Sequence, residues 1–413
     1  MREVVIIDGA RTPIGHFGKS LKDIPAVDLA SIAIKAALER SKILPSMVED
    51  VIMGVIHQEG MGNNPARIAS LKAGIPFTAG ALTVNNVCSS GMKAIEIAAR
   101  QIATGEYDTA LAGGMESNSQ CPYMLMNSRW GNRLGTTEAV DALFYDGFTD
   151  IYGMYGSYHH VGETAENIIE NSNKICAKYN LPEINLTSEN INKFALESQQ
   201  KYQRAKKENF FDEIAPVELK SKGKTNLIIH DESPRPDVSL EKLNSLKPVF
   251  REEGYVTPGN TPPLSDGAAA IILMAKDKAE ELNLNYMGLW KASTMGNVEP
   301  KYMGIGPIPA IRNLLRRTKL QLSDIDIFEI NEAQAQQVLF CIKALGIERN
   351  KVNVNGGAIA LGHPPGMTGV RLILTALYEL KRRHGKYAIC SQCAGGGTGM
   401  ATLIEHSKTS QEI

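Results

Sequence analysis

The chain has 413 residues, 43% of them hydrophobic, which is enough for two or three domains around a large buried core. Lysine and arginine number 44, and aspartate and glutamate number 45, so the formal net charge is -1. This balance argues against a nucleic-acid partner and against attraction to an anionic membrane.

The beginning of the chain and its apolar runs predict neither a signal peptide nor a membrane span. Residues 4–7 form a short strand-like run that stops at Asp8, unlike the long apolar region of a signal peptide. The longest apolar stretch, residues 267–275, is about half as long as a bilayer span requires. The cysteines are too sparse for a disulfide scaffold, so we predict a cytoplasmic enzyme with reduced thiols. They are Cys88, Cys121, Cys176, Cys341, Cys390 and Cys393.

Short β-branched runs alternate with helical patterns, starting with a strand at residues 2–8 and an amphipathic helix at residues 25–42. This alternation predicts an α/β fold with helices on both faces of the sheet. Three stretches recur later in the chain in the same order, which predicts two duplicated α/β halves. The pairs are residues 36–54 with 313–331, 83–102 with 352–377, and 107–117 with 387–399.

Residues 119–254 separate the two halves and carry weak sheet signals, with a charged helical pattern at residues 188–210. Long insertions commonly face a substrate or an interface, so we predict an inserted loop domain with such a role. The predicted division places the N-terminal half at residues 1–118, completed by about residues 255–280. The C-terminal half then covers residues 281–413.

Cys88 lies between a strand that ends near Asn86 and a strong helical pattern from Met92 onward. Free N–H groups and the helix dipole favour an anion at a helix N-terminus, so we predict a thiolate with a lowered pKa. The small residues at 89–91 are predicted to let a substrate approach. The alternative is a buried core cysteine, which is the commoner role of a cysteine.

His363 lies in a glycine-rich loop that leads into a helix predicted to begin near Thr368. By the internal repeat, this loop holds the place in the second half that the Cys88 turn holds in the first. We therefore predict that the two residues lie close together, with His363 as the base that converts the thiol to a thiolate. Taken alone, a histidine in a surface loop is the commoner explanation.

Cys390 and Cys393 have C-x-x-C spacing, which suggests a zinc site, a redox pair or a single useful cysteine. A structural zinc site needs four ligands, and the sequence has no second C-x-x-C. Three glycines follow, which disfavours the helix of a thioredoxin-like motif. The alternation around the pair fits a strand, which places the two thiols on opposite faces.

Asn331 and Glu332 follow a predicted strand. An asparagine in this position orients a water or a substrate carbonyl, although an asparagine at such a boundary is more often a helix N-cap.

With these residues assembled, the sequence closely resembles the thiolase family, of the acetyl-CoA acetyltransferase type. The matching motifs span nearly the whole chain in family order. They are RTPIG (11–15), NNVCSSG (85–91), GGMES (113–117), SDGAA (265–269), MGIGP (303–307), NEA (331–333), GGAIALGHP (356–364) and CAGGG (393–397).

The resemblance implies a five-layered α-β-α-β-α fold built from two halves around a helical layer, with an inserted loop domain. It implies a homotetramer, or a dimer as in some members. The implied reaction is the reversible condensation of two acetyl-CoA molecules to acetoacetyl-CoA and CoA, a step of fatty-acid metabolism. No permanently bound cofactor and no metal are expected, because CoA and acyl-CoA are substrates.

The resemblance also assigns roles within a ping-pong mechanism. Cys88 is the nucleophile that becomes acylated, and His363 takes its proton. Cys393 acts as acid and base at the α-carbon of the second substrate. One oxyanion hole combines His363 with a water held by Asn331, and the other uses the backbone N–H groups of Cys88 and Gly395. CoA is expected to contact Arg235 and His160, with Met303 near the CoA or acyl pocket.

The sequence departs from the family pattern at four places near these motifs. Gln334 replaces the phenylalanine that usually follows N-E-A, and Val161 replaces a methionine of the loop domain. A common N-A-S-G stretch is N-T-P-P at residues 260–263, and H-P-I-G is H-P-P-G at residues 363–366. These changes leave acyl chain length open.

Three other functions therefore stay open at this point. One is a thiolase for longer-chain 3-ketoacyl-CoA, and another is a condensing enzyme like the ketoacyl synthases. The third is a non-catalytic thiolase-like protein that binds acyl-CoA.

Overall fold

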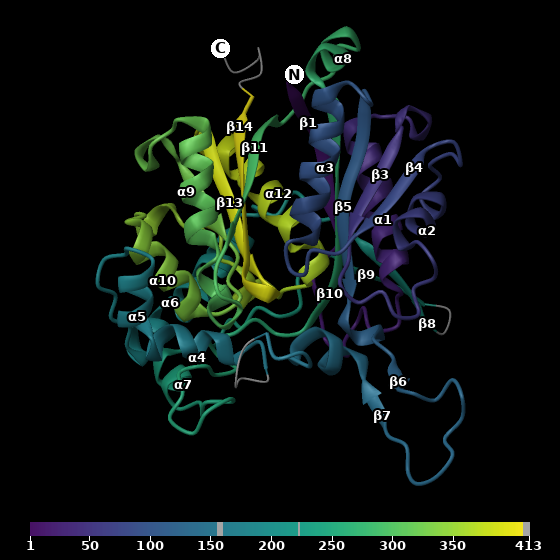
Figure 1. Ribbon diagram of the computed structural model, residues 1–413. Coiled ribbons are helices and arrows are strands. Elements are labelled where there is room, and N and C mark those ends of the chain that lie inside the picture. The colour runs from purple at the N-terminus through teal and green to yellow at the C-terminus, as the bar shows by residue number, and fades with distance from the viewer. Residues whose placement is uncertain (155–159, 222–223, 408–413) are drawn as a thin grey trace.

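The computed structural model describes residues 1–154, 160–221 and 224–407 (Figure 1). Strands and helices alternate in both halves of the chain, as the sequence predicts. The N-terminal strands and helices lie beside the C-terminal ones, and most of residues 119–254 lie at the lower end in Figure 1.

The first half contains β1 (Val4–Arg11), β2 (Gly15–His16), α1 (Ala26–Ser41), β3 (Asp50–Gly54), α2 (Pro65–Lys72), β4 (Gly80–Val84), α3 (Ser90–Thr104) and β5 (Thr109–Ser117). The inserted segment contains β6 (Tyr123–Leu125), β7 (Ala139–Asp141), α4 (Glu163–Glu170), α5 (Ser172–Lys178), α6 (Ser188–Lys207), β8 (Val217–Ser221), β9 (Lys224–Ile228) and α7 (Leu240–Asn244). The remainder contains β10 (Ser265–Ala275), α8 (Lys276–Glu281), β11 (Gly288–Asn297), α9 (Pro307–Thr318), β12 (Ile327–Ile330), α10 (Ala335–Leu345), α11 (Ala358–Leu361), α12 (Pro365–Arg383), β13 (Tyr387–Ala394) and β14 (Thr398–His406).

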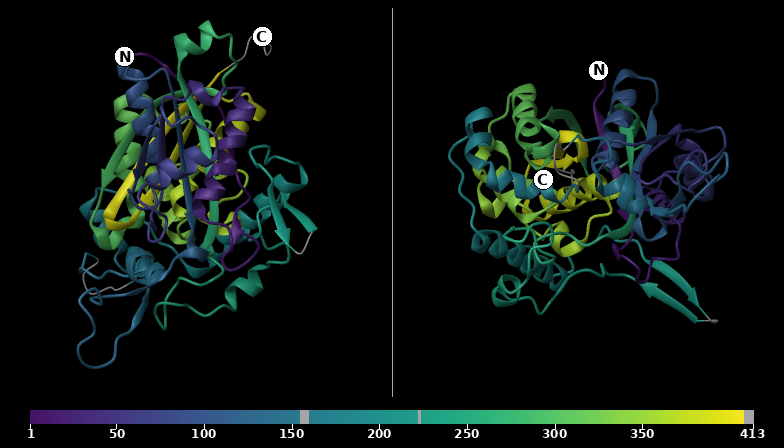
Figure 2. Two further views of the ribbon diagram at one scale, coloured as in Figure 1. Left: turned by 90° about the vertical axis from the view of Figure 1, so that its right-hand side faces the viewer. Right: turned by 60° about the horizontal axis from the view of Figure 1, so that its bottom comes forward.

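The long predicted helices are confirmed as α1 and α6. The helix after His363 begins at Pro365 rather than near Thr368, because proline suits the first turn of a helix, where its missing N–H costs nothing. The inserted segment contains two hairpins, β6–β7 and β8–β9, that its weak sheet signals did not predict. The β8–β9 hairpin projects from the body of the molecule (Figure 2).

The main sheet joins both halves in the order β12-β13-β14-β11-β1-β10-β5-β3-β4. Its two parts meet where residues 4–6 of β1 pair with residues 288–290 of β11. β10, which follows the insertion, pairs with both β1 and β5 and so completes the first half.

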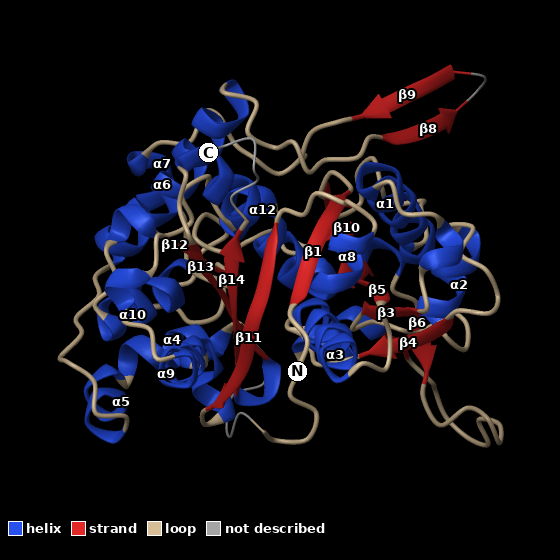
Figure 3. Ribbon diagram, turned by 90° about the horizontal axis from the view of Figure 1, so that it is seen from above, coloured by secondary structure: helices blue, strands red, loops and turns tan. Residues whose placement is uncertain are grey.

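Helices form three layers around these strands, which gives the predicted five-layered fold (Figure 3). α1 and α2 cover the outer face of the N-terminal strands, and α9 and α10 cover that of the C-terminal strands. α3 and α12 pack against each other between the two sets of strands. Each helical layer packs on the strands through a cluster of buried apolar side chains. Removal of these three clusters from water stabilises the stacking of helices on strands.

The starts of the two central helices are held together by close backbone contacts. A Cβ added at Gly114 would overlap the carbonyl oxygen of Gly366, and one at Gly91 would lie 2.5 Å from the same oxygen. Only glycine fits at such distances. Because Gly91 and Gly366 each follow a candidate site residue by three positions, this contact brings the two candidate loops together.

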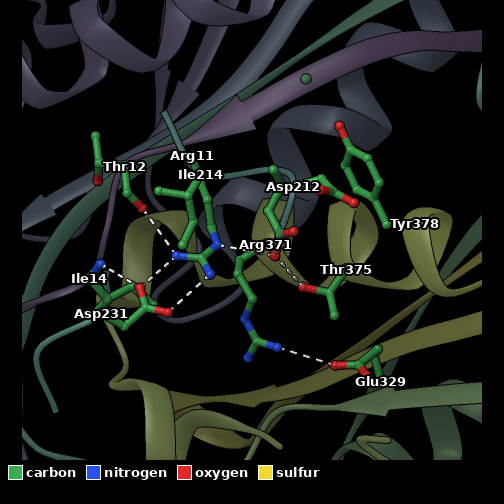
Figure 4. Close-up of polar contacts among 12 residues, drawn as sticks. Arg11, Thr12, Ile14, Asp212, Ile214, Asp231, Glu329, Arg371, Thr375 and Tyr378 are labelled. Atoms are coloured by element: carbon green, nitrogen blue, oxygen red, sulfur yellow. Dashed lines mark hydrogen bonds and ion pairs between the residues drawn. The ribbon is translucent and has the colours of Figure 1, made fainter. Parts of the chain in front are cut away.

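Buried polar contacts tie the inserted segment to both halves (Figure 4). Arg11 of β1 contacts Asp231 at 2.7 and 3.1 Å and Glu213 at 3.3 Å, and both carboxylates come from the insertion. Glu213 also accepts from the hydroxyl group of Thr375 of α12 at 3.3 Å, which joins the insertion to the C-terminal half. Arg371 of α12 contacts Glu329 of β12 at 3.2 Å within that half. Removing one partner of a buried ion pair lowers the free energy of unfolding by about 3–5 kcal/mol. The contacts of Glu213 and Asp231 therefore hold the insertion in place.

Within the part of the chain that the structure describes, none of the helices combines the length and the apolar character needed to cross a membrane.

Candidate active site

Cys88 lies in a tight turn between β4 and α3. The preceding residue, Val87, has φ +50°, a left-handed conformation that is strained for a β-branched side chain. The hydroxyl groups of Ser89 and Ser90 accept from the side-chain and backbone N–H groups of Asn86, both at 2.8 Å. The turn therefore presents Cys88 at the start of α3, in a half-buried position.

The expected role of the small residues 89–91 is wrong. Ser89 and Ser90 are fully buried and bind the backbone of their own turn instead of facing a substrate. Gly91 permits the close contact with α12. These residues are small because they shape the turn and admit the neighbouring helix.

The predicted lowering of the Cys88 pKa is also wrong. Burial raises the pKa of this thiol to about 11, and the charge of Glu116 adds to the rise. The backbone N–H of Gly395, which donates to the sulfur, acts in the opposite direction. Loss of hydration outweighs the helix N-terminus, so Cys88 is a neutral thiol.

His363 follows Gly362, whose φ of +107° is a glycine conformation. Its Nδ1 lies 2.7 Å from the hydroxyl oxygen of Thr368, and that hydroxyl donates to the carbonyl of Pro364 at 2.8 Å. Because the hydroxyl hydrogen of Thr368 is used in the bond to Pro364, the hydrogen between Thr368 and His363 must come from the ring. This network assigns the ring hydrogen of His363 to Nδ1 and the lone pair to Nε2. Burial and the charge of Arg371 lower the pKa of His363 to about 3, which keeps the ring neutral.

Asn331 follows the end of β12, as predicted, and its side-chain amide reaches the Nε2 of His363 at 3.4 Å. Its side-chain oxygen is buried and has no hydrogen-bond partner in the described ranges. The N-cap alternative is wrong, because α10 begins four residues later with Gln334 as its N-cap. Asn331 therefore lies beside the imidazole of His363.

Cys390 and Cys393 both lie on β13, and the predicted opposite orientation is confirmed. Cys390 packs in the central cluster around α3 and α12. Cys393 is 1% exposed, and burial followed by the charges of Cys88 and Cys341 raises its pKa well above the ordinary value. The two thiols do not form one dithiol centre, and the C-x-x-C spacing is coincidental.

Two buried glutamates hold the loops of the site in place, and the sequence reasoning did not single out this role. Glu116 accepts from the backbone N–H groups of Ile56, His57 and Gly366 at 3.1, 3.0 and 2.9 Å. It thereby fixes the end of β3 to the start of α12. The G-G-M-E-S motif contained this glutamate, but only the fold shows what it binds.

Glu332 also joins separate segments near His363 through hydrogen bonds. Its carboxylate accepts from Ser198 at 2.7 Å, from Asn353 at 2.9 Å and from the backbone N–H of Ile359 at 3.1 Å. These contacts connect the inserted helix α6 with the loop that leads to His363. Within the described ranges, no group of three or more His, Cys, Asp or Glu residues is placed to hold a metal ion.

The residues assigned to CoA by resemblance lie on different segments. Arg235 is exposed, and its backbone N–H donates to the side chain of Gln199 at 2.8 Å. The amide of Gln199 donates to the carbonyl of Ile359 at 3.2 Å, shortly before His363. The loop of Arg235 is thus anchored to the loop of the candidate base.

His160 and Met303 occupy less exposed positions. The ring of His160 lies among Phe144, Phe148 and Phe250, with centroid distances of 5.6, 5.7 and 4.6 Å, and burial lowers its pKa. Met303 is buried in a short helical turn, residues 300–305, that contacts the turn formed by Gly395–Gly397.

Comparisons with known proteins agree with this arrangement. Residues 4–277 match the family model for the thiolase N-terminal domain, and residues 284–406 match that for the thiolase C-terminal domain. The chain is 43% identical over 410 residues to a probable acetyl-CoA acyltransferase of Staphylococcus aureus, with 99% of this chain and all of the relative covered.

Solved structures show the same similarity. A Bacillus anthracis acetyl-CoA acetyltransferase has a TM-score of 0.92 and 40% identity, with 98% of this chain and 99% of that chain covered. Human mitochondrial 3-ketoacyl-CoA thiolase has a TM-score of 0.91 and 38% identity, with the same coverage. The fold and the matched domains define an acyltransferase, and they do not support a non-catalytic binding protein or a ketoacyl synthase.

The chain belongs to the thiolase family and is of the acetyl-CoA acetyltransferase type.

Proposed function

We propose that this thiolase is an acetyl-CoA C-acetyltransferase that condenses two acetyl-CoA molecules to acetoacetyl-CoA and CoA, and catalyses thiolysis in the reverse direction. One observation carries the proposal: the backbone N–H of Gly395, two residues after Cys393, donates to the sulfur of Cys88, which supports a single site that contains both thiols. One sulfur can thus hold an acyl group while the other serves the α-carbon of a second substrate.

In the first half-reaction the Cys88 sulfur attacks the thioester carbonyl, and its proton moves to the Nε2 of His363. The bond from the carbonyl carbon to the CoA sulfur breaks, and the departing CoA takes a proton from Cys393. The neutral imidazole with its lone pair on Nε2 supports the role of His363 as the acceptor.

In the second half-reaction the Cys393 thiolate removes the α-proton of acetyl-CoA. The resulting carbanion attacks the acyl carbonyl, the new carbon–carbon bond forms, and the Cys88 thiolate leaves and recovers its proton from His363. Burial of Cys393 supports this role, because a thiolate with a strongly raised pKa is a strong base once it has formed.

Both half-reactions place negative charge on a thioester oxygen. We assign one oxyanion hole to the backbone N–H groups of Cys88 and Gly395, and the other to His363 with a water oriented by Asn331. The contact of Asn331 with His363 and its free side-chain oxygen support the second assignment.

CoA and acyl-CoA are substrates in this proposal, and no permanently bound cofactor or metal is needed. We propose that CoA lies across residues 119–254, with Arg235 and His160 as contacts and Met303 near the acyl group. The anchoring of the Arg235 loop to the His363 loop through Gln199 supports this path.

A longer-chain 3-ketoacyl-CoA thiolase is the second candidate, because human mitochondrial 3-ketoacyl-CoA thiolase is almost as similar in sequence and fold as the bacterial acetyltransferase. Thiolysis of 3-ketoacyl-CoA substrates from about C4 to C16 separates the two, since a pocket discriminates chain length by about 1–3 kcal/mol per methylene. We expect the highest kcat/KM with acetoacetyl-CoA. No turnover of any member by the wild-type protein would refute both candidates.

We also propose a cytoplasmic homotetramer. β4 is an edge strand of the main sheet, and an exposed edge is a common pairing surface. The loop between β6 and β7 exposes Trp130 and Leu134 at 92% and 97%, as an interface between subunits would. The mechanism needs both thiols reduced, which fits a reducing compartment. Sedimentation of the purified protein tests the subunit number.

A further inference from the structure

Two buried acceptor atoms beside the site lack a partner. The side-chain oxygen of Gln334 and the hydroxyl oxygen of Thr261 have no hydrogen bond within residues 1–154, 160–221 and 224–407. Gln334 is only 6% exposed. Leaving a buried polar atom unpaired destabilises the folded protein, so each of these two atoms calls for an explanation.

The two residues lie on neighbouring segments that both reach the catalytic groups. Gln334 follows Asn331 by three residues, and the next backbone N–H, of Ala335, donates to the carbonyl of Asn260 at 2.9 Å. The loop that contains Thr261 then runs to Ser265, whose hydroxyl accepts from the backbone N–H of His363 at 3.2 Å. The segments that carry Gln334 and Thr261 thus contact each other, one continuing from Asn331 and the other leading to a contact with His363.

The amide of Asn260, in the same loop as Thr261, has a structural role and finds partners within the protein. Asn260, buried beside Thr261, accepts from the backbone N–H of Thr257 at 2.9 Å and donates to the carbonyl of Tyr255 at 2.8 Å. The side-chain oxygen of Gln334 has no such partner among the described residues. An apolar residue would fill the same volume without burying an unpaired oxygen. A bound molecule that donates a hydrogen bond accounts for the difference.

We infer that Gln334 and Thr261 form a polar subsite that accepts an N–H or O–H donor of the thioester substrate. The inference rests on the proposed function, because it assigns the donor to a thioester that acylates Cys88. The donor comes either from the amides of the CoA arm or from a hydroxyl group on the acyl chain. If the acyl chain supplies the donor, the subsite disfavours a long alkyl chain, since burying one against these oxygens leaves them unpaired.

The test compares Gln334→Met, which keeps the length of the side chain and removes the amide, with wild type. Gln336→Met is the matched control: Gln336 lies in the first turn of α10, two residues after the N-cap residue Gln334, is fully buried, and its amide also lacks a described partner. At the second residue, Thr261→Val removes the hydroxyl and Thr261→Ser keeps it.

The reaction measured is acylation of Cys88 by acetoacetyl-CoA, acetoacetyl-N-acetylcysteamine and an amide-free acetoacetyl ethyl thioester. We expect Gln334→Met and Thr261→Val to lower kcat/KM by about 10–100-fold with a donor-bearing substrate, while Gln336→Met and Thr261→Ser stay near wild type. If the CoA arm supplies the donor, the loss disappears with the ethyl thioester. If the acyl chain supplies it, the loss appears only with a hydroxylated 3-ketoacyl chain, on every carrier.

Equal kcat/KM of wild type and Gln334→Met on all substrates would overturn the subsite, as would an equal loss in Gln336→Met. Calorimetric binding of CoA and of a hydroxylated acyl-CoA to the same variants does not depend on turnover. The wild-type protein could bind either ligand more tightly than Gln334→Met and yet form no acyl-enzyme with any substrate. That result would refute the proposed function but would still support the subsite. Thermal melting of each variant separates loss of the subsite from loss of the fold.

Discussion

The starts of the two central helices hold related places in the duplicated halves but differ in their chemistry. At the start of α3, Cys88 is a half-buried thiol that receives the backbone N–H of Gly395, and burial raises its pKa. At the start of α12, His363 is a neutral imidazole fixed by a threonine hydroxyl. The two halves thus offer two matching positions, and in the proposed mechanism the different side chains at these positions act as nucleophile and base.

The largest expected effect comes from removing each member of this pair. Cys88→Ala should form no acyl-enzyme with acetyl-CoA, whereas His363→Ala should still acylate, roughly 10²–10⁴-fold more slowly, because it loses only the proton acceptor. Intact-protein mass spectrometry after mixing with acetyl-CoA measures both. Acetylation of the Cys88→Ala protein at the wild-type rate would contradict the assignment of the nucleophile.

The next effect separates the two half-reactions. Cys393→Ala should slow condensation by roughly 10²–10⁴-fold, because no group removes the α-proton, while acylation of Cys88 continues at a reduced rate. Cys390→Ala is the control, since this thiol packs on the other face of β13. Equal loss of both half-reactions in Cys393→Ala would argue against the division of labour.

The raised pKa of Cys88 predicts a pH dependence. With a pKa of about 11, the thiolate fraction, and so the rate of alkylation by iodoacetamide, should rise about tenfold per pH unit from about pH 7 to about pH 10. Peptide mapping should find Cys88 modified before the buried cysteines. A rate that levels off near neutral pH would show that the helix N-terminus outweighs burial after all.

The raised pKa of Cys88 also makes the stability of the fold depend on pH. The folded pKa lies above the ordinary value of 9.0, so the folded state holds the proton more tightly than the unfolded state does. The contribution of Cys88 is complete below about pH 9 and is lost as the pH rises through about 11. Denaturant unfolding of wild type and Cys88→Ala across this range measures it.

The smallest effect concerns the contact that joins the two helix starts. Gly366→Ala should lower the free energy of unfolding by about 1–3 kcal/mol and slow the acylation of Cys88. The added carbon overlaps the carbonyl oxygen of Met115 and therefore separates α12 from β5. Gly385→Ala, beyond the far end of α12, first meets the movable end of the Leu380 side chain at 2.9 Å and should change both quantities less. Urea unfolding and the acylation rate check the pair.

Local and repeated patterns predicted much of the molecule. The echoes between the halves indicated that the Cys88 and His363 loops are related, and strand alternation placed Cys390 and Cys393 on opposite faces. These features depend on residues close together in the chain or on a repeat that the sequence displays directly.

Other properties depend on packing between distant segments and could not be predicted in this way. Burial by the surrounding layers decides the pKa of Cys88, and no local pattern reports it. Ser89 and Ser90 turn inward because of the shape of their own turn. The meeting of Gln334 with the Asn260 loop joins two departures from the family pattern that lie some seventy residues apart in the sequence.

The position of β10 has a consequence for how the chain folds. This strand lies between β1 and β5, although more than 140 residues separate it from β5 in the sequence. During synthesis the N-terminal strands therefore cannot close into their final sheet until residue 275 has left the ribosome, by which time the whole insertion has emerged. Contacts of such long range fold slowly, and until then β1 and β5 expose unpaired edges that a chaperone can protect.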